Sequence, residues 1–155
     1  MEKAIQELLD KQAITELMIR YAERIDANDP EGAAACFAED GVGDYWGAYR
    51  GRKEIAARLA TILDDYSATT HQLTNANIMV DGNKATAMSY VYAFHRMADG
   101  TGETLDYWGR WFDKLVKTDE GWLFSEKKVV GVDHIPPKSS KQKFSLPGHP
   151  GRLQR

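Results

Sequence analysis

The sequence predicts an α+β fold in which N-terminal helices pack on one face of a curled antiparallel sheet. Two observations lead to this prediction. Apolar residues recur at helical spacing over roughly the first 65 residues, and from His71 onward the pattern changes to the alternation of strands. No helical segment separates the expected strands, which favours consecutive hairpins over a parallel sheet with crossover helices.

Three helices are expected before the sheet. The first covers residues 1–26, where apolar side chains recur every three or four positions. Asp29, followed by a proline, is the expected N-cap of a second helix over residues 30–40. Residues 43–51 form a short strand or loop rich in aromatic side chains, and a third helix is expected over residues 52–65.

Four strands are expected in the second half of the chain. They cover residues 71–80, 84–97, 104–118 and 122–132, and the turn sequences DGN, ADGTGE and DEG separate them. Such short connections predict an antiparallel meander.

A single domain over residues 1–135 is expected from the length of 155 residues. Residues 136–155 contain five basic residues and no acidic one, together with several prolines. This composition predicts a basic, poorly structured C-terminal tail.

The charge and cysteine content exclude several classes of protein. A net charge of −3 gives no indication of a nucleic acid partner, and the lone Cys36 excludes an internal disulfide framework. The charged N-terminus does not resemble a signal peptide, and no segment is apolar enough to span a membrane. We therefore expect a cytoplasmic protein with no membrane or nucleic acid partner.

Common catalytic motifs are absent. The sequence has no H-x-x-x-H or H-E-x-x-H pair, which makes a metal site unexpected, and no G-x-S-x-G, P-loop or G-x-G-x-x-G motif. We expect neither a metal nor an organic cofactor.

Asp26 and His71 are the residues whose positions need an explanation. Asp26 falls at the C-terminal end of the first helix, where the helix dipole disfavours an anion, so a cationic partner is expected. His71, at the head of the first long strand, is the natural candidate, because a carboxylate fixes the tautomer of a histidine and stabilises its cation. The alternative is a solvated Asp26 and a hydrogen-bonded core histidine.

The remaining histidines have simpler interpretations. His95, near a strand end, is expected to be solvated, while His134 follows Asp133 at the exit of the last strand and His149 lies in the tail. Among aromatic residues, the two long strands carry seven that alternation divides between the two faces of the sheet: Tyr90, Tyr92, Phe94, Tyr107, Trp108, Trp111 and Phe112.

Arg110 and Asp113 belong to the same long strand as several of these aromatic residues. Their spacing places them on opposite faces of that strand. We expect each to form a structural ion pair with neighbouring residues.

Four segments resemble the SnoaL-like branch of the nuclear transport factor 2-like superfamily. They are IRYAERIDANDPEGAAACFAEDG, GRKEIAARL, THQLTNANIMVDGNKATAMSYV and GRWFDKLVKTDEGWLFSEKKV. The resemblance implies a cone-shaped, curved antiparallel sheet with about three N-terminal helices covering its concave face. Dehydrochlorinase, scytalone dehydratase and bile acid 7α-dehydratase are relatives of this kind.

The resemblance also implies a site. Asp26 and His71 match the catalytic dyad of these enzymes, and Tyr21 and Tyr45 match two tyrosines of the bile acid dehydratase. The implied activity is that of a cofactor-independent lyase or isomerase, with a dehydratase favoured. It would abstract a proton from carbon in a small apolar or polycyclic substrate, within a homo-oligomeric trimer or dimer.

Two other functions share the same fold. One is a non-catalytic ligand-binding cone, and the other is the small subunit of a ring-hydroxylating dioxygenase.

Overall fold

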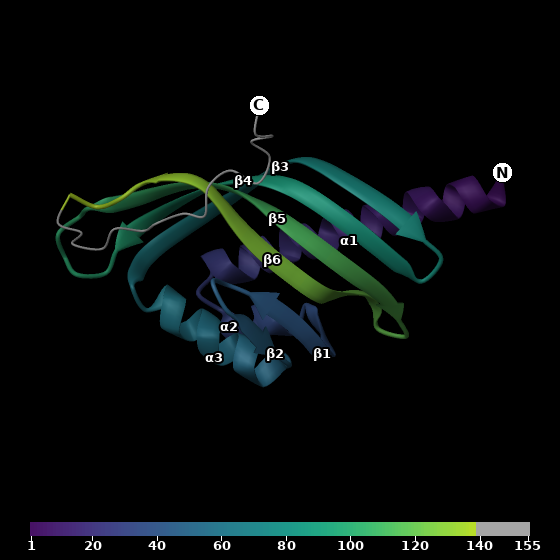
Figure 1. Cartoon of the computed structure of the whole chain (residues 1–155), viewed down its shortest axis with the longest axis horizontal. Coiled ribbons are helices and arrows are strands. Elements are labelled where there is room, and N and C mark those ends of the chain that lie inside the picture. The colour runs from purple at the N-terminus through teal and green to yellow at the C-terminus, as the bar shows by residue number, and fades with distance from the viewer. Residues whose placement is uncertain (139–155) are drawn as a thin grey trace, which may run out of the picture.

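The computed structural model describes residues 1–138, which form three helices and six strands. The order along the chain is α1 (Glu2–Asp26), α2 (Pro30–Ala34), β1 (Phe37–Asp44), β2 (Ala48–Arg50), α3 (Arg52–Leu63), β3 (Tyr66–Asp81), β4 (Lys84–Met97), β5 (Thr104–Thr118) and β6 (Gly121–Ile135). The strands form one curved sheet in the order β2-β1-β6-β5-β4-β3 (Figure 1).

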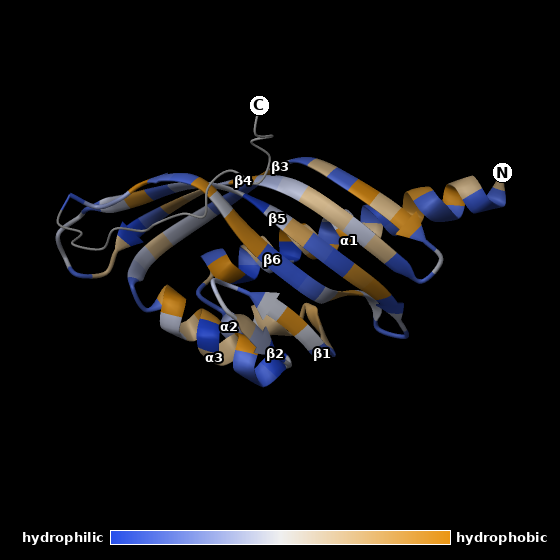
Figure 2. Ribbon diagram, in the orientation of Figure 1, coloured by the Kyte–Doolittle hydropathy of each residue, from blue (hydrophilic) through white to orange (hydrophobic). Residues whose placement is uncertain are grey.

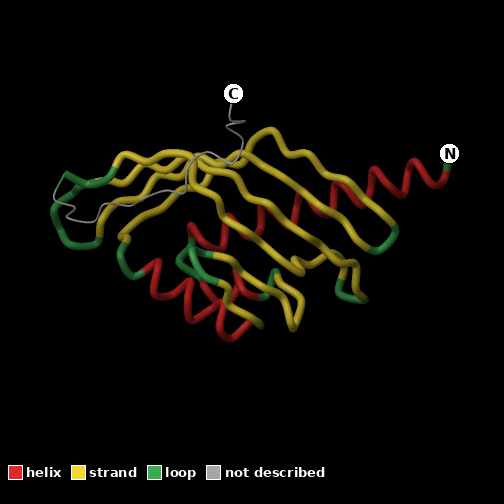
Figure 3. The backbone as a smooth tube through the Cα atoms, viewed as in Figure 1, coloured by secondary structure: helices red, strands yellow, loops and turns green. Residues whose placement is uncertain are grey.

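All three helices lie on the same side of the sheet, beneath its curve (Figures 1 and 3). The α+β class and the cone-like arrangement are therefore confirmed. One detail differs from the prediction, because β1 pairs with β6 in parallel and the sheet is mixed rather than wholly antiparallel.

The three long hairpins follow the turn sequences. β4 and β5 have the predicted bounds, and β3 pairs with β4, β4 with β5 and β5 with β6, all antiparallel. Strand β3 begins at Tyr66, five residues before the expected start, and β6 continues to Ile135. Blue and orange residues alternate along these strands in Figure 2, as expected for a sheet with one covered face.

The prediction of a helix over residues 30–40 is wrong in its second half. Asp29 caps the helix as expected, its Oδ1 accepting a hydrogen bond from the Gly32 amide at 2.8 Å, but α2 ends at Ala34. The chain then turns into β1, where Phe37 pairs with Phe124 of β6 and is fully buried. Tertiary packing thus outweighs the helix propensity of the alanine-rich segment.

Only the C-terminal half of helix α1 has a buried apolar face. Ile14, Leu17, Met18, Tyr21 and Ile25 are at most 6% exposed and form one side of the core. The earlier apolar residues of the helix, expected on the same face, are more than half exposed: Ile5, Leu8 and Leu9.

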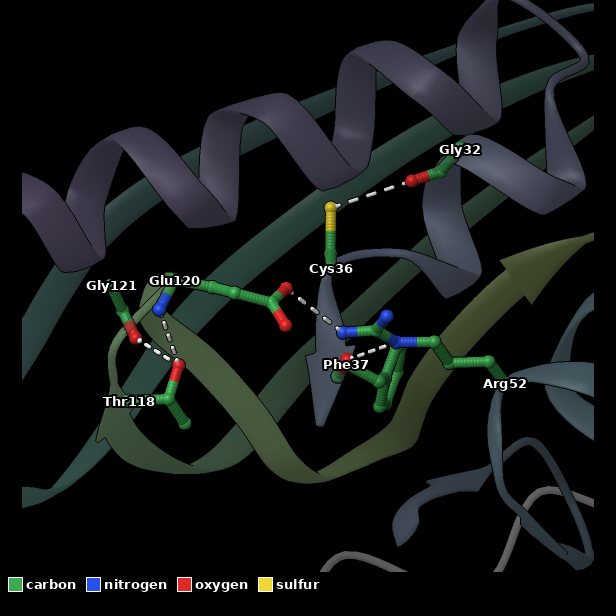
Figure 4. A network of polar contacts seen from close by, with 7 residues as sticks. All are labelled: Gly32, Cys36, Phe37, Arg52, Thr118, Glu120 and Gly121. Atoms are coloured by element: carbon green, nitrogen blue, oxygen red, sulfur yellow. Dashed lines mark hydrogen bonds and ion pairs between the residues drawn. The ribbon is translucent and has the colours of Figure 1, made fainter. Parts of the chain in front are cut away.

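Arg52, the first residue of α3, ties this helix to two other parts of the fold. Its Nε donates to the carbonyl oxygen of Phe37 at 2.7 Å, and its guanidinium contacts the Glu120 carboxylate at 3.5 Å (Figure 4). In the same network the Thr118 hydroxyl donates to the Gly121 carbonyl, which closes the β5–β6 turn. These contacts fix α3 against β1 and the end of the sheet.

None of the helices among residues 1–138 combines the length and apolarity needed to cross a bilayer. The C-terminal tail predicted for residues 136–155 falls almost wholly outside the described residues, as does His149.

Candidate active site

A cavity of about 300 Å³ lies between the helices and the concave face of the sheet. Its apolar wall includes Ile25, Leu59, Val91 and Trp111. Polar or ionisable residues also line it, among them Tyr21, Tyr45, Arg58, His71, His95 and Tyr107. A cavity with apolar walls and a few convergent polar groups is the usual form of a small-molecule site.

Asp26 and His71 meet at the edge of this cavity. The His71 Nδ1 lies 2.7 Å from Asp26 Oδ1, and the side chain of His71 is 11% exposed. Asp26 Oδ2 accepts a hydrogen bond from the His71 backbone amide at 2.9 Å, while the Thr69 hydroxyl donates to Oδ1 at 2.9 Å. The carboxylate therefore holds both the ring and the backbone of His71.

The positions of these two residues follow from the fold. Asp26 is the last residue of α1, and Thr69 and His71 face inward on β3 two positions apart. Burial acts to raise the pKa of Asp26, but the hydrogen bonds from His71 and Thr69 outweigh it and hold this pKa below its usual value. Asp26 is therefore an anion at neutral pH, despite its place at a helix C-terminus.

Tyr21 and Tyr45 also meet, although they are distant in sequence. Their hydroxyl oxygens lie 2.8 Å apart and both side chains are buried. A methyl group at Gly43 would lie 2.4 Å from the Tyr45 ring, so this glycine makes room for the ring to lie back across β1. Burial is the main cause that raises the pKa of both tyrosines, so both hydroxyls are protonated at neutral pH.

A buried ion pair lies against the ring of Tyr21. Lys127 Nζ lies 2.8 and 3.0 Å from the two carboxylate oxygens of Asp113, and both side chains are fully buried. The same ammonium group lies 4.8 Å from the centre of the Tyr21 ring and 4.0 Å from that of Trp111. The expectation of a structural ion pair at Asp113 is confirmed, while Arg110 lies on the opposite face over Tyr90.

The expectation that His95 is solvated is wrong. Strand alternation places it on the inner face, where its ring centre lies 5.5 Å from that of His71 and its Nδ1 lies 3.3 Å from the Leu105 carbonyl oxygen. Burial, followed by the nearby His71, lowers the pKa of His95 to about 4. The ring is therefore neutral at pH 7. His134 also reaches the cavity wall.

Alternation divides the aromatic residues of the long strands as expected. Tyr107 and Trp111 face the cavity, whereas Tyr90, Trp108 and Phe112 are about two-fifths exposed on the outer face. Arg58 and Trp46 line the cavity without having been expected from the sequence. Arg58 lies between Ile55 and Leu59 in the helical pattern of α3, and Trp46 lies in the turn after Tyr45, so neither carried a motif.

Within residues 1–138, no three histidine, cysteine, aspartate or glutamate side chains converge in a way that would hold a metal ion. The polar groups at the cavity include a histidine with its carboxylate partner and several hydroxyl groups.

Comparison with known proteins connects this geometry to a family. The sequence pattern of the SnoaL-like domain matches residues 6–128. An uncharacterized protein of Mycobacterium tuberculosis is 30% identical over 124 residues, which cover 77% of this chain and 83% of that protein.

Two solved structures have the same fold. A provisionally assigned scytalone dehydratase from Novosphingobium aromaticivorans superposes with a TM-score of 0.83 at 26% identity, covering 97% of this chain and 99% of that one. A hexachlorocyclohexane dehydrochlorinase from Novosphingobium barchaimii has a TM-score of 0.78, covering 88% of this chain and 96% of that one; at 16% identity it shows the fold alone. The match over residues 6–128 and this shared architecture lead to one conclusion: the chain belongs to the SnoaL-like domain family.

Proposed function

We propose that this protein is a cofactor-independent lyase or isomerase, with dehydration as the favoured reaction, and that His71 is its general base. The observation that supports this most strongly is the 2.7 Å contact between His71 Nδ1 and Asp26 Oδ1 at the wall of a largely apolar cavity. A histidine oriented by a carboxylate within reach of a bound substrate is the usual arrangement for general base catalysis.

The hydrogen bonds of His71 indicate which ring nitrogen accepts the substrate proton. Because the Nδ1–H group donates a hydrogen bond to the Asp26 carboxylate, Nε2 carries the free lone pair and accepts the proton from a substrate C–H bond. The ionised Asp26 then stabilises the imidazolium that forms, and the Thr69 hydroxyl and His71 amide keep the carboxylate in place. General base catalysis of this kind contributes roughly 10²–10⁴-fold to the rate.

The electrons of the broken C–H bond need an acceptor. In a substrate with a neighbouring carbonyl they form an enolate, and the Tyr21–Tyr45 pair supplies a hydrogen bond to its oxygen. A hydroxyl group on the next carbon then leaves as water, taking the proton held by His71, which completes a dehydration. Without a leaving group the proton returns to another carbon, which gives an isomerisation.

A screen of cyclic hydroxy-ketones and hydroxysteroids for loss of water tests this proposal, with product formation followed by mass spectrometry. On any compound that reacts, His71→Ala should abolish turnover, and Asp26→Asn should lose most of the rate because a neutral amide cannot stabilise the imidazolium. Tyr21→Phe should have a smaller effect, since it removes one donor among several.

Asp81→Asn is the matched control for the aspartate variant, because Asp81 is exposed at the far end of the same strand. It should retain full activity. Circular dichroism should show that all variants keep the fold. A fully active His71→Ala protein would contradict the mechanism and favour the alternative of a non-catalytic ligand-binding cone.

A further inference from the structure

Tyr107 has a buried hydroxyl group that nothing among residues 1–138 satisfies. The side chain lies on β5, lines the cavity and is 8% exposed, and its oxygen has no hydrogen-bond partner in the described part of the chain. A buried hydroxyl without a partner destabilises a protein, and native structures nearly always supply one. The missing partner is therefore a feature that needs an explanation.

The orientation of this side chain depends on Gly109. A methyl group at Gly109 would lie 2.6 Å from the Tyr107 hydroxyl oxygen and equally close to the edge of its ring. The ring thus lies back along β5 across the glycine, in space that any other residue would fill. Gly109 leaves space for the Tyr107 hydroxyl group, but no residue among 1–138 forms a hydrogen bond with it.

The strand register places Tyr107 in the same row as His71. His71 of β3 pairs with Ala93 of β4, and Ala93 pairs with Tyr107 of β5, so the three side chains project from the same face. Neighbouring strands are about 4.8 Å apart, which separates the backbones of His71 and Tyr107 by roughly 10 Å. Only the methyl group of Ala93 stands between them in that row.

Trp46 is the exposed neighbour of Tyr107. Its indole is 55% exposed, lines the cavity and lies edge-on to the Tyr107 ring, with 6.3 Å between the ring centres. The backbone of Trp46 has a φ of 59°, a left-handed conformation that bulky residues rarely adopt. A large apolar side chain held in this way at the cavity is better explained by a ligand than by the packing of the protein itself.

We propose that the Tyr107 hydroxyl donates a hydrogen bond to a neutral oxygen of the substrate. Burial raises the pKa of Tyr107, so the group remains a donor at neutral pH. Tyr21 and Tyr45 share one hydrogen bond, whereas the buried Tyr107 hydroxyl has no partner among residues 1–138. This inference rests on the proposed function, because it takes the cavity as the substrate site.

Binding of two matched ring compounds tests the inference. 1-Tetralone carries one carbonyl oxygen and tetralin carries none, and their affinities are measured by isothermal titration calorimetry. The unmodified protein should prefer 1-tetralone. Tyr107→Phe should weaken 1-tetralone binding about fivefold, the usual effect of one net hydrogen bond, and leave tetralin binding unchanged. Tyr90→Phe, on the outer face of the sheet, is the control and should leave both affinities unchanged.

The stability of the ligand-free protein provides a second readout. Tyr107→Phe should be as stable as the unmodified protein or more stable, because it removes an unpaired buried hydroxyl, whereas loss of a structural hydrogen bond would destabilise the fold. The inference is overturned if the unmodified protein does not prefer 1-tetralone, or if Tyr107→Phe leaves the ratio of the two affinities unchanged.

His71→Ala separates this inference from the proposed function. The variant should keep the preference for 1-tetralone while losing turnover. If it keeps both, the proposed mechanism fails and the role of Tyr107 stands.

Discussion

Lys127 has a charged side chain that is fully buried, which is rare for lysine. Its ammonium group is fully buried among the rings of Tyr21, Trp111 and Phe124, with Asp113 as its only ionic partner among the described residues. Burial lowers the pKa of Lys127 and raises that of Asp113, while the pairing of the two charges opposes both shifts. Each charge therefore depends on the other.

Lys127→Met should destabilise the fold by about 3–5 kcal/mol, because it leaves the Asp113 carboxylate buried and unpaired. The double variant Lys127→Met with Asp113→Val should be more stable than either single variant, since it removes both charges and keeps apolar volume. Urea unfolding followed by circular dichroism measures all four proteins as a double-mutant cycle.

Two outcomes would contradict this interpretation. One is a Lys127→Met protein as stable as the unmodified one, and the other is a double variant no more stable than the single ones. Lys114→Met is the control, because Lys114 forms an exposed pair with Glu126 on the outer face of the same hairpin.

Residue-level features were predictable only where a residue stood out from its own segment. Asp26 did, because an anion at a helix C-terminus needs a partner, and the family resemblance indicated His71. Lys127 and His95 did not, because their burial depends on strand alternation and on partners across a hairpin. The pairing of Asp113 with Lys127 is a consequence of register, which the turn between their strands sets.

At the scale of elements, α1 is attached to the sheet at two separate places. Its C-terminal half packs by apolar burial, whereas its N-terminal half is attached through Asp10. The Asp10 carboxylate accepts hydrogen bonds from Trp122 Nε1 at 2.9 Å and Lys117 Nζ at 2.7 Å, and Asp10 is 6% exposed. This polar contact fixes the first turns of the helix against the β5–β6 hairpin.

Asp10→Asn should lower the free energy of unfolding by about 1–2 kcal/mol at pH 7, because the charged hydrogen bond to Lys117 is lost. Burial acts to raise the pKa of Asp10, but the hydrogen bonds from Lys117, Trp122 and Gln6 outweigh it and hold this pKa below its usual value. The carboxylate therefore stabilises the fold above about pH 4, and this contribution is lost as the pH falls through the pKa of the folded state.

The difference in stability between the two proteins should accordingly shrink below pH 4, as measured by urea unfolding at several pH values. Glu7→Gln, at an exposed position of the same helix, should have little effect at any pH. A difference that stays constant down to pH 2 would show that Asp10 acts through its shape and not its charge.

The elements predicted most accurately are those bounded by turns. β4 and β5 have the expected ends because DGN, ADGTGE and DEG leave the chain few alternatives. β1 was missed because its sequence, FAEDGVGD, contains two glycines and three acidic residues and lacks the usual β-forming pattern. Its strand conformation comes from pairing with β6, which no local signal reports.

At the scale of the whole molecule, the helices and strands of the described part of the chain lie between Glu2 and Ile135. The boundary after residue 135 stays a prediction, and Pro137, two residues beyond it, is buried. A protein truncated after Lys138 should therefore fold and unfold with the same midpoint temperature as the full chain, as measured by calorimetry. A chain ending at Lys128 should fail to fold, because it loses the second half of β6. If the first truncation also unfolds, residues 139–155 belong to the folded domain.

The overall architecture was predictable because helical and alternating periods occupy separate parts of the chain, and the family resemblance added the curvature. The expected homo-oligomer and cytoplasmic location stay predictions. Periodicity alone could not predict the cavity. Its shape depends on the positions of the Tyr45 and Tyr107 rings, which lie against Gly43 and Gly109.

The parallel pairing of β1 with β6 has a consequence for the order in which the protein forms. Phe37 near the start of the chain pairs with Phe124 near the end of the described part, so this contact closes a very long loop. The local hairpins from β3 to β6 close short loops and should form first. During synthesis, α1 and the β1 segment leave the ribosome well before the strand that completes their side of the sheet exists. We therefore expect Tyr45, next to the end of β1, to reach Tyr21 only in a late stage of folding, so that the candidate active site should be assembled after most of the sheet.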